Sequence, residues 1–264
     1  MYFQANYTFQ KILTDVADDG INQTRVSPFL DNANRRLDYA RASYDTTHIF
    51  NFNTLFELPF GKGHHFFNNA GGVLDRLVGG WQLTSIIQFA SGPPLSILDP
   101  RGTLNRAGRS GNQTANSTLT KDQIKDLIGT YYVPVGNQQG IPAGVYLINP
   151  SVIATSGRAS NGFGAPTFGG QAFFNVSPGQ TGALERFFIN GPNYWNWDAS
   201  LIKNIRIKES ARLQLRVEAF NLTNSTRFFV GPASTIFNIN STSFGRLTSA
   251  YSPRIVQLVG RFEF

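Results

Sequence analysis

The residues with chemically reactive side chains are too few and too scattered to predict a catalytic or metal-binding site. The 264-residue sequence has no cysteine, and its three histidines are His48, His64 and His65. The adjacent pair would need further ligands to hold a metal ion, and the neighbouring residues 61–63 (GKG) supply none. The Gly-x-Ser-x-Gly and His-Glu-x-x-His motifs of hydrolases and metalloproteases are absent from the sequence. We therefore expect no enzyme activity, no metal site and no cofactor.

Charged side chains near the C-terminus do follow a pattern, which suits the wall of a water-filled channel. Along 211–222 and 254–264, polar and apolar residues mostly alternate. Successive side chains of a strand point to opposite faces, so each segment would have one polar and one apolar face. A polar face inside a membrane barrel would solvate the lumen, or contact a plug or a substrate. The candidate lumen-facing residues are Arg212, Arg216, Glu218, Arg261 and Glu263.

Composition and charge restrict the class of protein and its partners. Charged residues make up 15% of the chain, below the roughly 25% that is usual for soluble domains. The net charge is +7, but the basic residues are dispersed, and the densest group is Arg101, Arg106 and Arg109 in a glycine-rich loop. We therefore expect no nucleic-acid partner. No apolar run approaches the roughly 18 residues of a membrane-spanning helix, although alternating strands could still cross a membrane.

Segments with alternating apolar and polar residues are predicted to be strands. The clearest is the last, 254–264, whose length suits a tilted membrane-crossing strand of about 9–11 residues and which ends on Phe264. Ile202 and Lys203 interrupt the alternation of their own strand, which indicates a β-bulge. The predicted strands are about 2–10, 48–60, 81–91, 197–207, 211–222 and 254–264.

The links between these strands alternate in length. Links 61–80 and 208–210 are the shorter ones, and 11–47, 92–196 and 223–253 are long. Outer-membrane barrels have short periplasmic turns and long extracellular loops. We therefore predict an all-β fold, an antiparallel transmembrane β-barrel segment with its C-terminus at the periplasmic side.

The longest link, about 92–196, is predicted to be an irregular extracellular loop. It is rich in Gly, Asn, Thr and Pro. One short helix is expected, because Thr120 and Gln123 form a capping-box pattern ahead of the apolar Ile124, Leu127 and Ile128. So long an irregular stretch is improbable in a compact soluble domain but ordinary outside a membrane barrel.

Four stretches resemble the C-terminal barrel of TonB-dependent outer-membrane receptors and occur in the family's order. The branch that they most resemble is the Oar-like group, whose members typically carry an N-terminal carboxypeptidase-regulatory-like domain. The stretches are 45–61 (DTTHIFNFNTLFELPFG), 79–94 (GGWQLTSIIQFASGPP), 191–204 (GPNYWNWDASLIKN) and 213–224 (LQLRVEAFNLTN).

This resemblance implies a barrel of about 22 strands with a plugged lumen, which imports a scarce ligand with energy delivered by the TonB complex. It also implies that the barrel-assembly machinery recognises the terminal strand through Phe264, Phe262 and Leu258. The sequence departs from the family in having no plug domain, TonB box, signal peptide or regulatory domain. We therefore expect residues 1–264 to be a single partial barrel domain, about six terminal strands of a larger barrel in the bacterial outer membrane. Its partners would be membrane lipid and the missing N-terminal barrel and plug, which would also bear the TonB contact.

Two other hypotheses fit parts of the pattern. A non-transporting, adhesin-type small barrel would bind an extracellular ligand through its long loop, but about eight strands are needed to close a barrel. The extra hairpin would then have to come from 145–148 and 172–176. A soluble β-sandwich that binds carbohydrate would also show alternating strands, with one face in water.

Overall fold

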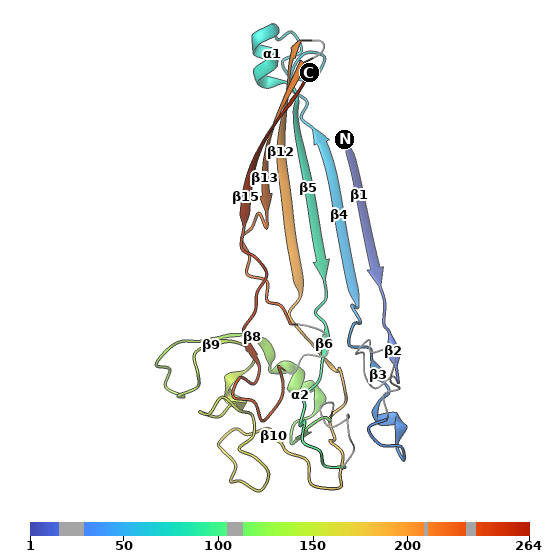
Figure 1. Cartoon of the computed structure of the whole chain (residues 1–264), viewed down its shortest axis with the longest axis vertical. Coiled ribbons are helices and arrows are strands. Elements are labelled where there is room, and N and C mark those ends of the chain that lie inside the picture. The colour runs from blue at the N-terminus through green and yellow to red at the C-terminus, as the bar shows by residue number, and fades with distance from the viewer. Residues whose placement is uncertain (16–28, 105–112, 209–210, 231–235) are drawn as a thin grey trace.

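The molecule is a long, twisted sheet with a folded lobe at one end and a short helix at the other (Figure 1). The computed structural model describes residues 1–15, 29–104, 113–208, 211–230 and 236–264. No helix among these residues is long and apolar enough to cross a membrane.

The sheet is an antiparallel meander in which each strand pairs with the next long strand of the chain. Its order is β1-β4-β5-β12-β13-β15, so β1 and β15 form the two edges. Strand β12 extends beyond its predicted start at 197, and β15 ends one residue before Phe264. The six strands are β1 (Tyr2–Phe9), β4 (His48–Glu57), β5 (Trp81–Ala90), β12 (Tyr194–Lys208), β13 (Ala211–Phe220) and β15 (Ile255–Glu263).

The register of the strands joins their apolar faces into one continuous surface. One apolar row crosses four strands as Ala5, Phe52, Ile87 and Trp197, and another crosses the last four as Leu83, Leu201, Val217 and Leu258. On the opposite face, a row of amides runs through Asn6, Asn51, Gln88 and Asn196. The sheet therefore has one apolar and one polar side along its whole width.

The predicted bulge at Ile202 and Lys203 is wrong. Pairing between β12 and β13 is regular from Ala199 to Arg206, and the irregularity lies between Arg206 and Lys208. Lys203 stays on the apolar face because its ammonium group bonds to backbone carbonyls at the end of the sheet. The break in the alternation at Lys203 therefore reflects a charged group with hydrogen-bond partners, not the extra residue of a bulge.

The two ends of the sheet differ in the size of their links. The β4–β5 link carries helix α1 (Gly72–Val78) at one end, where β12 also ends and β13 begins. The β1–β4, β5–β12 and β13–β15 links all extend to the other end (Figure 1).

The prediction that 92–196 is an irregular loop is wrong in one respect, because much of this segment folds into a lobe with its own buried core. Aromatic and aliphatic side chains fill this core, among them Tyr146, Phe173, Phe237 and Phe244, all fully buried. Phe237 and Phe244 come from the β13–β15 link, so the two links fold together. The capping box predicted at Thr120 and Gln123 is confirmed at the start of α2 (Lys121–Asp126).

The described residues of the lobe and the adjoining links form short elements. Strand β9 pairs with β8 and β14, β7 pairs with β10, β6 with β11 and β2 with β3. The strands are β2 (Leu13–Thr14), β3 (Ala40–Arg41), β6 (Pro94–Leu95), β7 (Asn116–Ser117), β8 (Ile128–Val133), β9 (Gly144–Ile148), β10 (Phe173–Phe174), β11 (Ile189–Asn190) and β14 (Arg246–Leu247), and the short 3-10 helices are η1 (Arg35–Leu37) and η3 (Pro150–Val152).

The hairpin that an eight-stranded barrel would need does not join the large sheet. Residues 145–148 lie in β9 and residues 173–174 in β10, and both strands pair only with other short strands of the lobe. Their side chains are mostly buried in the lobe core because they are apolar on both faces.

Candidate functional site

The five charged residues singled out by the sequence lie together on the polar face of β13 and β15. Arg216 Nη1 lies 3.0 Å from Glu218 Oε1, and Arg261 Nη2 lies 3.0 Å from Glu263 Oε1. Arg212 is paired in register with Glu263 across the two strands. Each of the two carboxylates therefore has a guanidinium within reach, which suits a hydrated wall.

The three residues of the predicted assembly signal lie on or beside the other face of β15. Leu258 is paired with Val217, and Phe262 with Leu213. Phe264 follows the end of the strand, is 97% exposed and stacks on Phe262 with ring centroids 5.9 Å apart. Among the described residues, nothing pairs with the outer edge of β15, so its backbone groups and these side chains are open to another strand.

Aromatic and amide side chains gather where the sheet meets the lobe. His48 lies here, with Nδ1 2.8 Å from the Tyr7 hydroxyl and its ring close to Phe9, which agrees with a structural role at the rim. Arg227, which the sequence did not single out, lies over the Tyr194 and Tyr251 rings. Its position comes from the β13–β15 link, and no local sequence pattern marks it.

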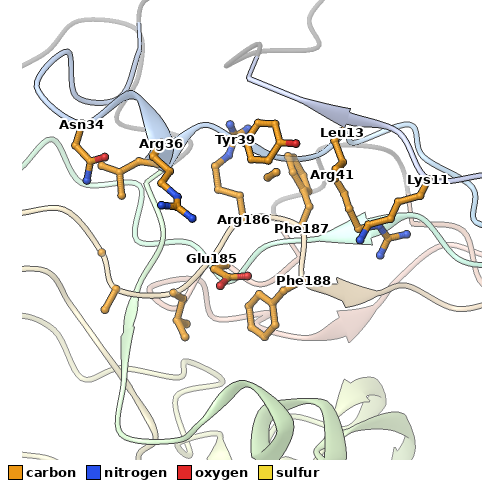
Figure 2. Close-up of a pocket in the computed structure, with 15 residues that line it drawn as sticks. Lys11, Leu13, Asn34, Arg36, Tyr39, Arg41, Glu185, Arg186, Phe187 and Phe188 are labelled. Atoms are coloured by element: carbon orange, nitrogen blue, oxygen red, sulfur yellow. The ribbon is translucent and has the colours of Figure 1, made fainter.

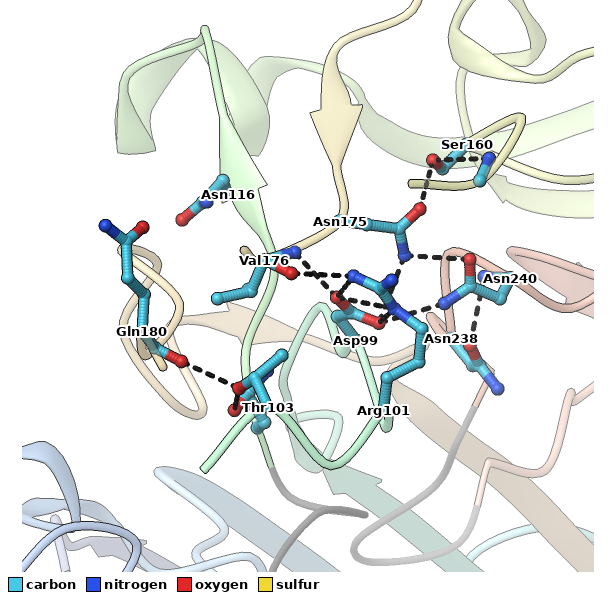
Figure 3. A network of polar contacts seen from close by, with 12 residues as sticks. Asp99, Arg101, Thr103, Asn116, Ser160, Asn175, Val176, Gln180, Asn238 and Asn240 are labelled. Atoms are coloured by element: carbon cyan, nitrogen blue, oxygen red, sulfur yellow. Dashed lines mark hydrogen bonds and ion pairs between the residues drawn. The ribbon is translucent and has the colours of Figure 1, made fainter. Parts of the chain in front are cut away.

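A buried carboxylate joins three distant segments of the lobe (Figure 3). Asp99 is fully buried and accepts hydrogen bonds from Arg101 Nε and Nη2, at 2.9 and 2.8 Å. The Val176 N–H donates to it at 2.8 Å, and the side-chain amides of Asn175 and Asn240 donate at 3.1 and 3.0 Å. The residues 99–101, 175–176 and 240 therefore form one clamp, which we call the Asp99 clamp.

The clamp keeps Asp99 ionised. Burial acts to raise the pKa of this carboxyl group, but the hydrogen bonds from Arg101, Val176 and Asn175, with the charge of Arg101, outweigh it. The pKa of Asp99 therefore lies below its ordinary value. The basic group predicted at 101–109 is correspondingly less available to an anion, because Arg101 is already paired with Asp99. Arg106 and Arg109 lie outside the described residues.

A pocket of about 560 Å³ opens between the start of the chain and residues 182–188 at the lobe end of the sheet (Figure 2). Basic and aromatic side chains line it, and two of its four cationic side chains form ion pairs. Arg41 pairs with Asp45 at 2.9 Å and Arg186 with Asp38 at 3.2 Å. The lining residues that Figure 2 labels are Lys11, Leu13, Asn34, Arg36, Tyr39, Arg41, Glu185, Arg186, Phe187 and Phe188. The pocket is a mixed polar and aromatic surface.

A comparison with curated proteins matches a short part of the chain. Part of the chain is similar to a chorismate synthase of Bradyrhizobium sp. (strain BTAi1 / ATCC BAA-1182), with 39% identity over 69 residues. This similarity covers 26% of the chain and 17% of the chorismate synthase, so the chain spans less than a fifth of that relative. No solved structure matches.

A family model described as an outer membrane beta barrel domain matches residues 1–257, nearly the whole chain. This breadth agrees with the two-sided sheet, whose apolar face suits lipid and whose polar face suits water. The chain therefore belongs to the outer-membrane β-barrel domain family and is located in the outer membrane.

Proposed function

We propose that this chain forms the C-terminal barrel portion of a TonB-dependent outer-membrane transporter, which in its full-length form imports a scarce ligand that remains unidentified. The observation that carries the proposal is the sheet itself, with six strands and both edges unpaired among the described residues. Unpaired backbone groups are costly in lipid, and barrels need about eight strands or more to close. Further strands must therefore complete the wall, as they do in the large receptors that the four sequence stretches resemble.

The lobe faces the cell exterior in this proposal, and the α1 end faces the periplasm. Three long links extend to the lobe end, which is the usual arrangement outside an outer-membrane barrel. The apolar face then touches lipid, and the charged residues of β13 and β15 line the lumen. The pocket in Figure 2 lies on the outer side, where an incoming ligand would meet the receptor first.

The same geometry supports a proposal for the partners. The open edge of β15 can accept a strand by backbone pairing, which gives the barrel-assembly machinery a mechanism for recognising the Phe264 end. The remaining barrel strands and the plug come from the rest of the receptor, and TonB contacts that part alone.

Crosslinking to TonB tests the proposal in the natural, full-length gene product. Outer membranes containing that product are incubated with the purified periplasmic domain of TonB and a short amine-reactive crosslinker. We expect a crosslinked species that an unrelated small barrel in the same membranes does not give. The absence of this species, with the gene product folded in the membrane, would refute TonB-dependent transport.

The adhesin-type alternative predicts a different result. It requires this chain to close by itself, so the refolded 264-residue chain would show heat-modifiable migration on a gel as a compact barrel. We expect aggregation instead, because β9 and β10 are committed to the lobe and leave the sheet with open edges.

A further inference from the structure

Backbone and carboxylate contacts close the β4–β5 link on itself at the α1 end of the sheet. The Lys62 N–H donates to Asp75 Oδ1 at 2.6 Å, and the Gly79 N–H donates to the Asp75 carbonyl at 2.8 Å. Gly61 has φ +108°, and a Cβ built on it would lie 2.7 Å from Gly79 Cα. The two glycines therefore let the ends of the link touch, and α1 is held in one place.

Lys203 fastens the end of α1 to the sheet. Its Nζ donates to the carbonyls of Leu77 and Gly79 and lies 4.9 Å from the centre of the Trp81 ring. The residue is only 6% exposed, although it sits on the apolar face of β12. The carbonyls satisfy its charge there, so α1 stays beside the apolar face at the end of the barrel wall.

Helix α1 has one apolar side, and most of that side is exposed rather than packed against the protein. At helical spacing, Val73, Leu74, Leu77 and Val78 fall on one side, and Asp75 and Arg76 fall on the other. Val73 is 73% and Leu77 66% exposed. The adjacent Phe66 and Phe67 are 50% and 58% exposed.

The two sides of α1 continue the two faces of the sheet. An apolar pocket of about 380 Å³ lies between Leu77 and Val78 of the helix and Leu58, Trp81 and Leu201 at the sheet. Leu201 belongs to the apolar face, since it pairs with Leu83 and Val217.

A second, polar pocket of about 580 Å³ lies by the opposite side of the helix, lined by Asp75 and Arg76 together with Asn204 and Arg206 of the polar face. Helix α1 thus separates a surface continuous with lipid from a surface continuous with water.

We propose that α1, with Phe66 and Phe67, is an interfacial anchor that lies in the periplasmic leaflet of the outer membrane, and that its apolar pocket holds an acyl chain of a phospholipid there. The occupant is lipid because the pocket continues the apolar face of a barrel wall that already touches lipid. An amphipathic helix of this kind buries its apolar side about 5–10 Å into the boundary between headgroups and acyl chains. The inference rests on the orientation given in the proposed function.

Spin labels on the two sides of α1 test this inference. The chain has no cysteine of its own, so Val73→Cys and Arg76→Cys would each carry one label in this segment, and Leu74→Cys provides a second apolar position. Val217→Cys, on the apolar face of β13, serves as the barrel control. The full-length protein is reconstituted in vesicles of phosphatidylethanolamine and phosphatidylglycerol, and folding is checked by heat-modifiable migration. Accessibility to oxygen and to a water-soluble nickel chelate then gives the depth of each label.

We expect the labels at 73 and 74 to lie about 5–10 Å below the phosphate level and the label at 76 to be in water. If the labels at 73 and 74 are accessible to the nickel chelate while the label at 217 is not, the anchor is refuted and the barrel assignment stands. If the label at 217 is also in water, the orientation of the sheet in the membrane fails as well. A label at 73 shielded from both reagents would mean that protein covers the helix, which also overturns the anchor.

Discussion

Replacing Asp99 with alanine should loosen the outer lobe while leaving the barrel wall intact. Asp99 is the centre of the Asp99 clamp, where it accepts from the backbone of Val176 and from three side chains. None of these partners belongs to the six-stranded sheet. The effect should therefore be confined to the lobe.

The size of the effect follows from which donors lose their only partner. The Val176 N–H would be left buried without an acceptor, at a cost of about 1–3 kcal/mol. Asn175 Nδ2 keeps Asn240 Oδ1 at 2.9 Å, so its loss is small. Arg101 is 37% exposed and can be solvated, so breaking its ion pair adds about 1 kcal/mol at most. The sum is about 1–4 kcal/mol for opening of the lobe.

Hydrogen exchange measured by mass spectrometry on the protein in outer-membrane vesicles reports this opening free energy. The expected loss corresponds to exchange roughly 5- to 700-fold faster in peptides that contain Val176, since about 1.4 kcal/mol is tenfold. Peptides from β12 and β13 serve as the internal reference.

Asp122→Ala is the matched control, because Asp122 makes an exposed ion pair with Lys125 at 3.1 Å. Its loss should cost about 1 kcal/mol or less. Equal exchange in the Asp99→Ala and Asp122→Ala proteins would refute the reasoning, since it would mean that the buried hydrogen bonds contribute no more than a surface pair.

Three further outcomes follow from the structure. The pKa of Asp99 is lowered in the folded lobe, so the stability that the ionised carboxylate contributes is complete above the ordinary carboxyl pKa of about 3.9 and declines as the pH falls through the folded pKa. The protease resistance of the lobe should therefore drop at pH 3 in the natural protein. No drop relative to the Asp99→Asn protein would contradict this. Deleting Phe264 from the full-length receptor should lower the amount of folded barrel in the outer membrane, measured as the heat-modifiable band. The Phe264→Tyr variant should keep the natural amount of folded barrel. An equal amount after the deletion would exclude the assembly role. Lys203→Met should speed hydrogen exchange in α1 roughly 10- to 150-fold, since a hydrogen bond to a charged group contributes about 1.5–3 kcal/mol. Unchanged exchange would show that Lys203 does not hold the helix.

The sequence by itself determined the strands and their faces. Side-chain alternation is a local property of an extended chain, so the apolar and polar residues of 211–220 or 255–263 can be assigned to faces without knowing their neighbours. The helix at 121–126 could be predicted for the same reason, because its capping box involves residues three positions apart. The alternation in link length could be predicted from the strand positions alone.

Only the tertiary structure decided how residues far apart in the chain come together. Asp99, Asn175 and Asn240 form one clamp because the lobe core brings three segments from two links together, and no sequence spacing records that contact. Lys203 looked like a break in its strand because its carbonyl partners lie more than 120 residues earlier, in the β4–β5 link. The apolar segments at 145–148 and 173–174 could have entered the membrane on their pattern alone, but burial in the lobe core competes with lipid for the same side chains. Local periodicity shows which face is apolar, and long-range packing decides what covers it.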